Sequence, residues 1–196
     1  IQKYNLVPNS KDGYCALREK YNQTPIAERD SRMLYTLILY GFQQQIRFNT
    51  NHRFNNPVGS RWFNECLLSK FVTFARCSKE KNVKYYNVSF EHLEEEINAD
   101  VFIYADPPYR STLGVYNDGK RGFEGWTLEH EQRLCAFLDN VHQRGALFML
   151  SYVLQVDNFF NNEIANWIER NHYVVIDIEM PQGRYNNRRE VLIKNY

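Results

Sequence analysis

The chain has 196 residues, enough for one domain, or one domain with a small lobe, around a real hydrophobic core. Hydrophobic residues make up 43% and aromatic residues 15%, which excludes a disordered chain, and no apolar run is long enough to span a bilayer. The four cysteines are scattered and form no C-x-x-C pair, which indicates a reduced cytosolic chain without zinc. The sequence does not open with a basic segment followed by an apolar one, so nothing in it indicates secretion or a membrane partner.

The net charge of +1 is distributed unevenly along the chain. Residues 41–90 hold eight Lys or Arg against two acidic residues, whereas residues 91–196 hold ten against seventeen. A basic segment followed by an acidic body is expected of a chain that contacts a polyanion through one part only. A solvated basic face is the plain alternative.

The N-terminal part is predicted to be mainly helical over residues 1–46. The apolar residues at helical spacing there are Leu34, Leu37, Ile38 and Phe42. Residues 47–64 contain five Asn, one Pro and one Gly without a regular period, which predicts a basic loop. A second helix is predicted over 65–77, a strand over 83–90 and a short helical turn over 91–97.

From residue 101 onward, predicted strands and helices alternate. A strand over 101–104 precedes a helix that Thr127 can cap and Gly145 can end. The remaining predicted elements are a helix over 158–171 and strands over 146–151, 173–179 and 190–196. This order predicts a mostly parallel α/β sheet with right-handed crossovers, in which ligands bind beyond the carboxyl ends of the strands.

The sequence Asp-Pro-Pro-Tyr at 106–109 follows the first of these strands. A carboxylate beside a proline carbonyl offers two acceptors without a competing backbone donor, which suits an amino group held by both hydrogens. Tyr109 offers a flat face for stacking on a ring. This pattern favours a pocket for the exocyclic amine of a planar base, which would have to leave a duplex to reach it. A Pro-Pro turn with a surface acid is the alternative.

The motif resembles the DPPY signature of amino-methyltransferases that use S-adenosylmethionine. Further segments resemble, in the same order, those of the Dam-type DNA adenine methyltransferases, especially the phage members: 4–22, 39–49 followed by 53–61, 85–90, 148–154 and 190–196. The resemblance implies a Rossmann-like methyltransferase α/β sheet with a small helical and loop DNA-recognition lobe. We expect that lobe over 1–85 and the catalytic part over 86–196.

The resemblance implies transfer of a methyl group from S-adenosylmethionine to N6 of adenine in double-stranded DNA, with GATC as the expected site, base flipping as the route and no metal. It also implies a cytoplasmic location in a bacterial cell or a phage-infected host, and a role such as restriction-modification. Asp106, Pro107, Pro108 and Tyr109 would form the catalytic turn, with Asp106 and Phe90 also contacting the cofactor.

The resemblance assigns DNA contacts to the loop region: Phe42, Arg47, Asn49, Pro57 and Arg61. Arg61 is the best candidate for reading guanine, because Arg matches its two major-groove acceptors. Phe42 is expected as a wedge at the flipping site, with a core helix position as the alternative. Arg53 is expected to contact phosphate generically, and Tyr116 to line the base pocket or merely to pack.

The sequence departs from the family in its cofactor motifs. No glycine-rich loop of the FxGxG type follows a strand, and Ser89 stands before Phe90, where many relatives have Asp. We therefore expect an N-terminally incomplete chain. Two alternatives stay open: an inactive or split DNA-binding relative, and an amino-methyltransferase acting on RNA or protein.

Overall fold

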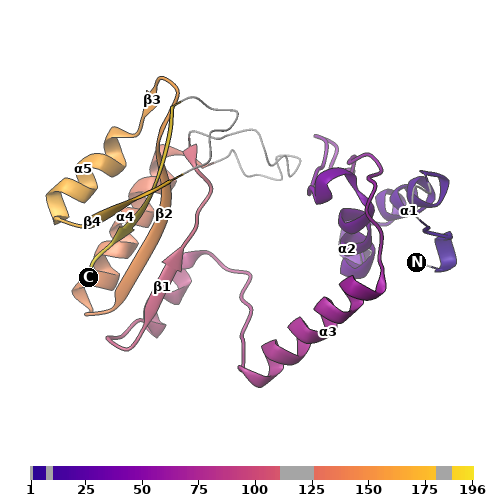
Figure 1. Cartoon of the computed structure of the whole chain (residues 1–196), viewed down its shortest axis with the longest axis horizontal. Helices are drawn as coiled ribbons and strands as arrows, with labels where there is room; N and C mark the ends of the chain where they lie inside the picture. The colour runs from indigo at the N-terminus through magenta and orange to yellow at the C-terminus, as the bar shows by residue number, and fades with distance from the viewer. Residues whose placement is uncertain (1, 8–10, 111–125, 180–186) are drawn as a thin grey trace. The chain divides into compact units, whose positions relative to one another are not determined.

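A computed structural model describes residues 2–7, 11–110, 126–179 and 187–196 (Figure 1). They form two compact units, of which the first ends at Tyr86 and the second begins at Asn87. Within these described ranges no helix is long and apolar enough to cross a membrane. The same residues contain no cluster of three or more His, Cys, Asp or Glu side chains suited to a metal ion.

The first unit is mainly helical, as its periodicity predicts, and its described residues form three α-helices. They are α1 (Lys11–Gln23), α2 (Ser31–Tyr40) and α3 (Glu65–Glu80), with short 3-10 segments η1 (Gln2–Tyr4), η2 (Ile26–Glu28) and η3 (Phe42–Gln44). Asp30 caps α2 by accepting from the backbone N–H of Arg32. The core of this unit packs α1 and α2 against the following loop, through Leu6, Tyr14, Leu17, Tyr21, Leu37, Tyr40, Phe48 and Phe54.

The strand predicted over 83–90 is wrong. Residues 83–88 form no helix or strand, and Phe90 begins the 3-10 segment η4 (Phe90–Glu96). The aromatic residue that made this stretch look strand-like packs on α3 instead: the Tyr85 ring lies 6.5 Å from that of Phe74, and its hydroxyl is 2.8 Å from Ser78 Oγ. An extended segment becomes a strand only when a neighbour pairs with its backbone.

The second unit contains a five-stranded sheet in the order β1-β2-β5-β4, with β3 paired to β2. The strands are β1 (Phe102–Ala105), β2 (Leu147–Val156), β3 (Phe159–Phe160), β4 (Val174–Ile178) and β5 (Arg188–Lys194). Among the strands of the described residues, only β1 and β2 pair in parallel, so the prediction of a mostly parallel sheet is wrong. Residues 179–187 are too few for a crossover between β4 and β5, and strands joined by a short connection pair antiparallel.

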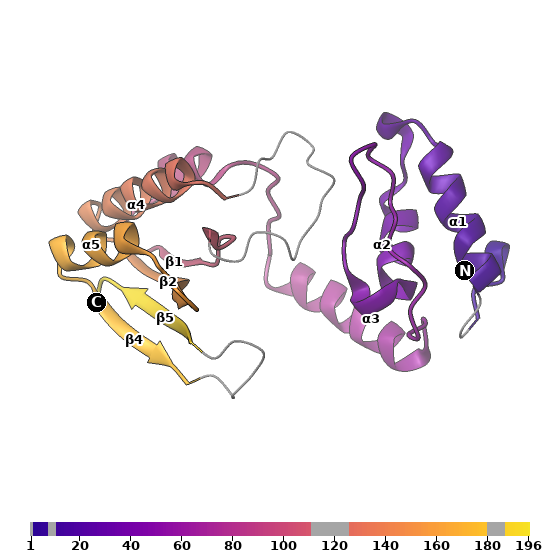
Figure 2. The same cartoon turned by 90° about the horizontal axis from the view of Figure 1, so that it is seen from above.

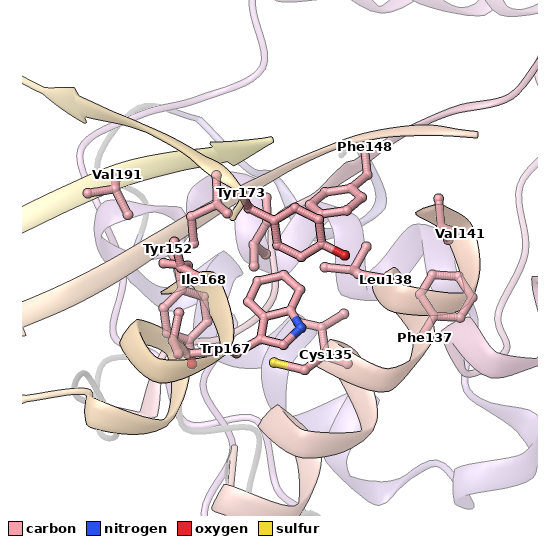
Figure 3. Close-up of a cluster of buried hydrophobic side chains, with 14 of the residues drawn as sticks. Cys135, Phe137, Leu138, Val141, Phe148, Tyr152, Trp167, Ile168, Tyr173 and Val191 are labelled. Carbon is pink, nitrogen blue, oxygen red and sulfur yellow. The ribbon is translucent and has the colours of Figure 1, made fainter. Parts of the chain in front are cut away.

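Two helices, α4 (Leu128–Gln143) and α5 (Asn162–Asn171), cover one face of this sheet (Figures 1 and 2). Thr127 caps α4 and Gly145 follows its end with a φ of 77°, as the sequence predicts. Figure 3 shows the core between helices and sheet, where the Phe148 ring of β2 stacks on Trp167 of α5 at 6.1 Å. This packing anchors β2, the strand that pairs with β1 ahead of the candidate site.

Candidate functional site

The Asp-Pro-Pro-Tyr turn leaves the sheet where β1 ends. The parallel register of β1 with β2 brings the turn beside Ser151 and Tyr152. The Tyr109 hydroxyl donates to Asp106 Oδ1 at 2.9 Å and lies 3.3 Å from Ser151 Oγ. The Tyr109 ring meets the ring of Tyr152 edge-on, with centroids 5.3 Å apart. The two residues that the sequence singled out for chemistry therefore belong to one hydrogen-bonded turn.

The turn presents acceptors on an accessible carboxylate. Asp106 and Pro108 are exposed, whereas Pro107 and Tyr109 are half-buried. The bond from Tyr109 uses one carboxylate oxygen, and a carboxylate accepts up to about four hydrogen bonds, so Asp106 keeps capacity for a further donor. Burial raises the pKa of Tyr109, so its hydroxyl remains a donor to Asp106 at neutral pH.

A buried carboxylate that the sequence analysis missed is linked to the end of this turn. Glu131 of α4 is fully buried, and its Oε2 lies 3.3 Å from Nε of Arg110, the residue after the turn. Its Oε1 accepts from the Tyr152 hydroxyl and, at 2.7 Å, from Asn161 Nδ2. The available signal was the position of Glu131 three residues before Leu134, on the apolar face of the predicted helix.

Phe90 lies in the second unit, where it begins η4. Its half-buried ring meets the ring of Phe137 of α4 at a centroid distance of 5.2 Å. This contact anchors Phe90 to the core of the unit. Its role toward the cofactor stays a prediction.

The five residues predicted to contact DNA lie in the first unit, between α2 and α3. Two antiparallel bridges, Gly41 with Val58 and Phe48 with Phe54, fold the segment back on itself. The exposed members are Phe42, Arg47, Pro57 and Arg61. Phe42 comes after the end of α2 and is 50% exposed, so its interpretation as a core helix position is wrong.

Asn49 acts within the loop. Its Oδ1 accepts from the backbone N–H groups of Asn51 and Arg53, each at 3.0 Å, which closes the turn at the loop tip. The Arg53 guanidinium pairs with Glu19 of α1, at 2.8 Å from Oε2. Arg53 is thus held against α1, and its contact with phosphate stays a prediction. Tyr116 lies outside the described residues.

Asn56 is a second buried polar residue that the sequence analysis missed, and no pattern marked it. Its Nδ2 donates to the carbonyls of Phe42 and Gln45 at 3.0 and 3.1 Å. The backbone carbonyl of Asn56 accepts from the Tyr14 hydroxyl at 2.9 Å and from Arg18 Nη1 at 3.1 Å. Burial raises the pKa of Tyr14 to about 12, which keeps this hydroxyl a donor. Asn56 therefore clamps the loop onto α1.

The clamp encloses strained backbone. Gln43 and Gln44, between the two bonded carbonyls, have φ of 52° and 53°. Left-handed backbone at a residue other than glycine costs about 1–3 kcal/mol and persists only where surrounding contacts fix it. Gly59 contributes by close approach, since a Cβ there would lie 2.5 Å from the Gly41 carbonyl oxygen. Contacts within the protein thus fix the backbone conformation at the exposed end of the loop.

A comparison with known protein families shows the family to which this chain belongs. The profile of the D12 class N6 adenine-specific DNA methyltransferases matches residues 1–180. The chain belongs to this family. The match spans both units, including the loop and the turn, and confirms the family expected from the DPPY motif.

Individual methyltransferases and methylases are also similar to this chain. The chain is 36% identical over 203 residues to the type II methyltransferase M.FokI of Planomicrobium okeanokoites, and 36% identical over 202 residues to the modification methylase LlaI of Lactococcus lactis. These matches cover all of this chain and 31% of each relative, so the chain spans about a third of their length. The DNA adenine methylase of Escherichia coli (strain K12) is 24% identical over 146 residues, covering 73% of this chain and 51% of that protein.

Proposed function

We propose that this chain is the part of a DNA adenine methyltransferase that holds the target base and reads the DNA around it. The observation that carries the proposal is the turn at the end of β1, where Tyr109 bonds the Asp106 carboxylate next to two prolines. Membership of the D12 family makes N6 of adenine the expected acceptor.

The chemistry of the turn follows from its acceptors. An adenine flipped out of the duplex would donate one amine hydrogen to Asp106 and the other to the Pro107 carbonyl, with its ring stacked on Tyr109. Holding both hydrogens aims the nitrogen lone pair away from the turn, and alignment of this kind supplies much of the rate. As the nitrogen acquires a methyl group it becomes positive before it releases a proton, and the Asp106 carboxylate stabilises that charge.

S-adenosylmethionine is the methyl donor that the family implies, and when bound it supplies a methyl group on a positively charged sulfur. The residues of the second unit fit part of such a site. Phe90 offers an aromatic ring for the adenine of the cofactor, and Asp106 offers a carboxylate near the reacting nitrogen. The family's glycine-rich motif is not found in this sequence, so an upstream segment is proposed to supply the rest.

The loop of the first unit is the proposed reader of DNA. Its exposed Phe42 has the size and exposure of a wedge that separates stacked bases. Arg61 is exposed and suits the two acceptors of guanine, which supports a guanine in the recognition site. GATC is the site that the resemblance to the Dam-type enzymes implies. We propose that Arg47, Asn49 and Pro57 contact the DNA around the recognition site. Loop residues that are held rigid before binding lose less entropy on contact with DNA.

Methyl transfer to defined acceptors tests this function. Labelled S-adenosylmethionine is incubated with a GATC duplex, the same duplex with the site scrambled, an RNA and a peptide. The protein is used as this chain and as the chain extended upstream through its gene. Transfer by the extended form to the GATC duplex alone is expected. DNA binding without transfer by either form would identify a binding module, and transfer to RNA or peptide would identify a different amino-methyltransferase.

A further inference from the structure

Glu131 is a charged side chain in a position that packing alone disfavours. It is 0% exposed, and it sits on the face of α4 that buries the core of the second unit. An ionised carboxylate inside a protein is costly unless charges and hydrogen bonds compensate it. Its partners therefore show what the carboxylate holds in place.

The first partner is the residue directly after the catalytic turn. Arg110 Nε lies 3.3 Å from Glu131 Oε2, and Arg110 Nη2 donates to Asn161 Oδ1 at 3.4 Å. The guanidinium also lies 5.3 Å from the ring centroid of Phe159 in β3. These contacts tie the end of the turn to α4, to β3 and to the residue that caps α5.

The second partner contacts the turn through its ring. The Tyr152 hydroxyl donates to Glu131 Oε1, while the Tyr152 ring meets Tyr109 edge-on at 5.3 Å. Glu131 thus reaches Tyr109 by two routes, one through the chain at Arg110 and one through the ring of Tyr152. Tyr109 in turn donates to Asp106.

We propose that Glu131 is a positioning residue for methyl transfer, which holds Tyr109 and, through it, the Asp106 carboxylate in the geometry that binds the target amine. The inference rests on the proposed function, since it assigns the turn to that reaction. Because Glu131 is fully buried, it is proposed to act through Tyr109 and not by contact with the base or the donor. A purely structural role, as glue between α4 and α5, is the alternative that the experiment has to separate.

The chain offers a matched control on the same helix. Asp139 of α4 accepts from Trp167 Nε1 at 2.8 Å and from the Tyr173 hydroxyl at 2.9 Å, so it also joins α4 to neighbouring elements through an aromatic hydroxyl. Within the described part of the chain, neither of these partners belongs to the turn. Asp139→Asn and Glu131→Gln therefore make the same chemical change at sites that differ in their link to the turn.

Steady-state kinetics give the first readout, in the form of the protein that shows methyl transfer. Glu131→Gln is expected to lower kcat by about 100-fold, the cost of misplacing a reacting group by about 1 Å, with little change in KM for DNA. Arg110→Met should act in the same direction, and Arg110→Lys, which keeps the charge, should retain more kcat than Arg110→Met. Asp139→Asn should leave kcat unchanged even if it lowers the melting temperature.

Amide hydrogen exchange gives a second readout that does not need activity. Glu131→Gln and Arg110→Met are expected to speed exchange at the amides of Asp106, Tyr109 and Arg110, whereas Asp139→Asn is not. Unchanged exchange at the turn in both variants, or an equal effect of Asp139→Asn, would overturn the proposal. If the parent protein transfers no methyl group, the proposed function fails and the exchange data still decide the positioning. If Glu131→Gln does not fold, the two Arg110 variants decide it.

Discussion

The first unit holds its exposed loop with side chains that bond to backbone, whereas the second unit holds its exposed turn with side chains that bond to one another. In the loop, the Asn56 side chain donates to the backbone carbonyls of Phe42 and Gln45. The backbone carbonyl of Asn56 in turn accepts from the Tyr14 hydroxyl. In the turn, Tyr109 bonds Asp106, and Glu131 pairs with Arg110 behind them. The loop therefore has a fixed backbone path, and the turn has fixed side-chain positions.

This difference suits the two tasks proposed for the units. Reading DNA requires a surface of the right outline, on which exposed residues such as Phe42 and Arg61 are displayed. Holding an amine for reaction requires one carboxylate oriented within a fraction of an ångström. We expect substitutions in the loop to act mainly on binding and stability, and substitutions at the turn to act mainly on rate.

The largest effect is expected at the turn. Asp106→Ala removes the carboxylate proposed to accept the amine hydrogen and to stabilise the developing charge on nitrogen, and should lower kcat by about 1000-fold. Affinity for DNA, measured by fluorescence anisotropy, should change little because the loop is untouched. Asp100→Ala, at the opposite end of β1 and also exposed, is the control and should keep full activity. A loss of binding equal to the loss of rate would remove the distinction between the units.

The next effect is expected at the clamp of the loop. Asn56→Ala leaves the carbonyls of Phe42 and Gln45 without their buried donor, which should cost about 2–4 kcal/mol in the free energy of unfolding of the first unit. Site-specific DNA binding should weaken with it. Urea titration followed by a probe in each unit measures the change. Asn51→Ala at the exposed loop tip should change stability by less than about 0.5 kcal/mol.

A smaller effect is expected from the same substitution made once in each unit. Gly59→Ala places a Cβ 2.5 Å from a backbone oxygen, so the loop must move, and we expect a loss of about 2 kcal/mol. At Gly145 the nearest neighbour is Ala99 Cβ at 3.5 Å, so only the left-handed φ of 77° is strained. Gly145→Ala should therefore cost about 1 kcal/mol. Thermal unfolding of both variants compares them, and a reversed order would contradict the close approach at Gly59.

The smallest change concerns chemical reactivity and not stability. Burial raises the pKa of the Cys135 thiol to about 12, so it stays neutral and unreactive in the folded protein at pH 8. Cys66 on α3 is exposed. A maleimide reagent at pH 8 should label Cys66 and leave Cys135 unlabelled, as peptide mass spectrometry can show. Rapid labelling of Cys135 would mean that the core of the second unit opens readily.

Local sequence patterns predicted the helices and several strands because their causes are local. The cap at Thr127, the helix end at Gly145 and the strand before Asp106 all follow from residues close in the chain. The strand expected over 83–90 failed because pairing depends on a distant neighbour. The mostly parallel sheet failed because β4 and β5 are joined by too few residues for a crossover, a length that the strands predicted over 173–179 and 190–196 already indicated.

The candidate site divides in the same way. Asp106 and Tyr109 were found because they lie in the same four-residue turn of the sequence. Glu131, Tyr152 and Asn161 come from three separate elements, and only the fold shows that they meet. The clamp at Asn56 was missed for the same reason, since its partners lie on α1 and at the far end of the loop.

The product of the reaction tests the central claim most directly. A GATC duplex is incubated with deuterated S-adenosylmethionine and with the form of the protein that is extended upstream through its gene. The DNA is then digested to nucleosides, which are analysed by mass spectrometry. We predict a deuterated methyl group on N6 of adenine, lost in Asp106→Ala. Label on N4 of cytosine, or adenine labelling that survives Asp106→Ala, would contradict the assignment of this turn to the adenine amine.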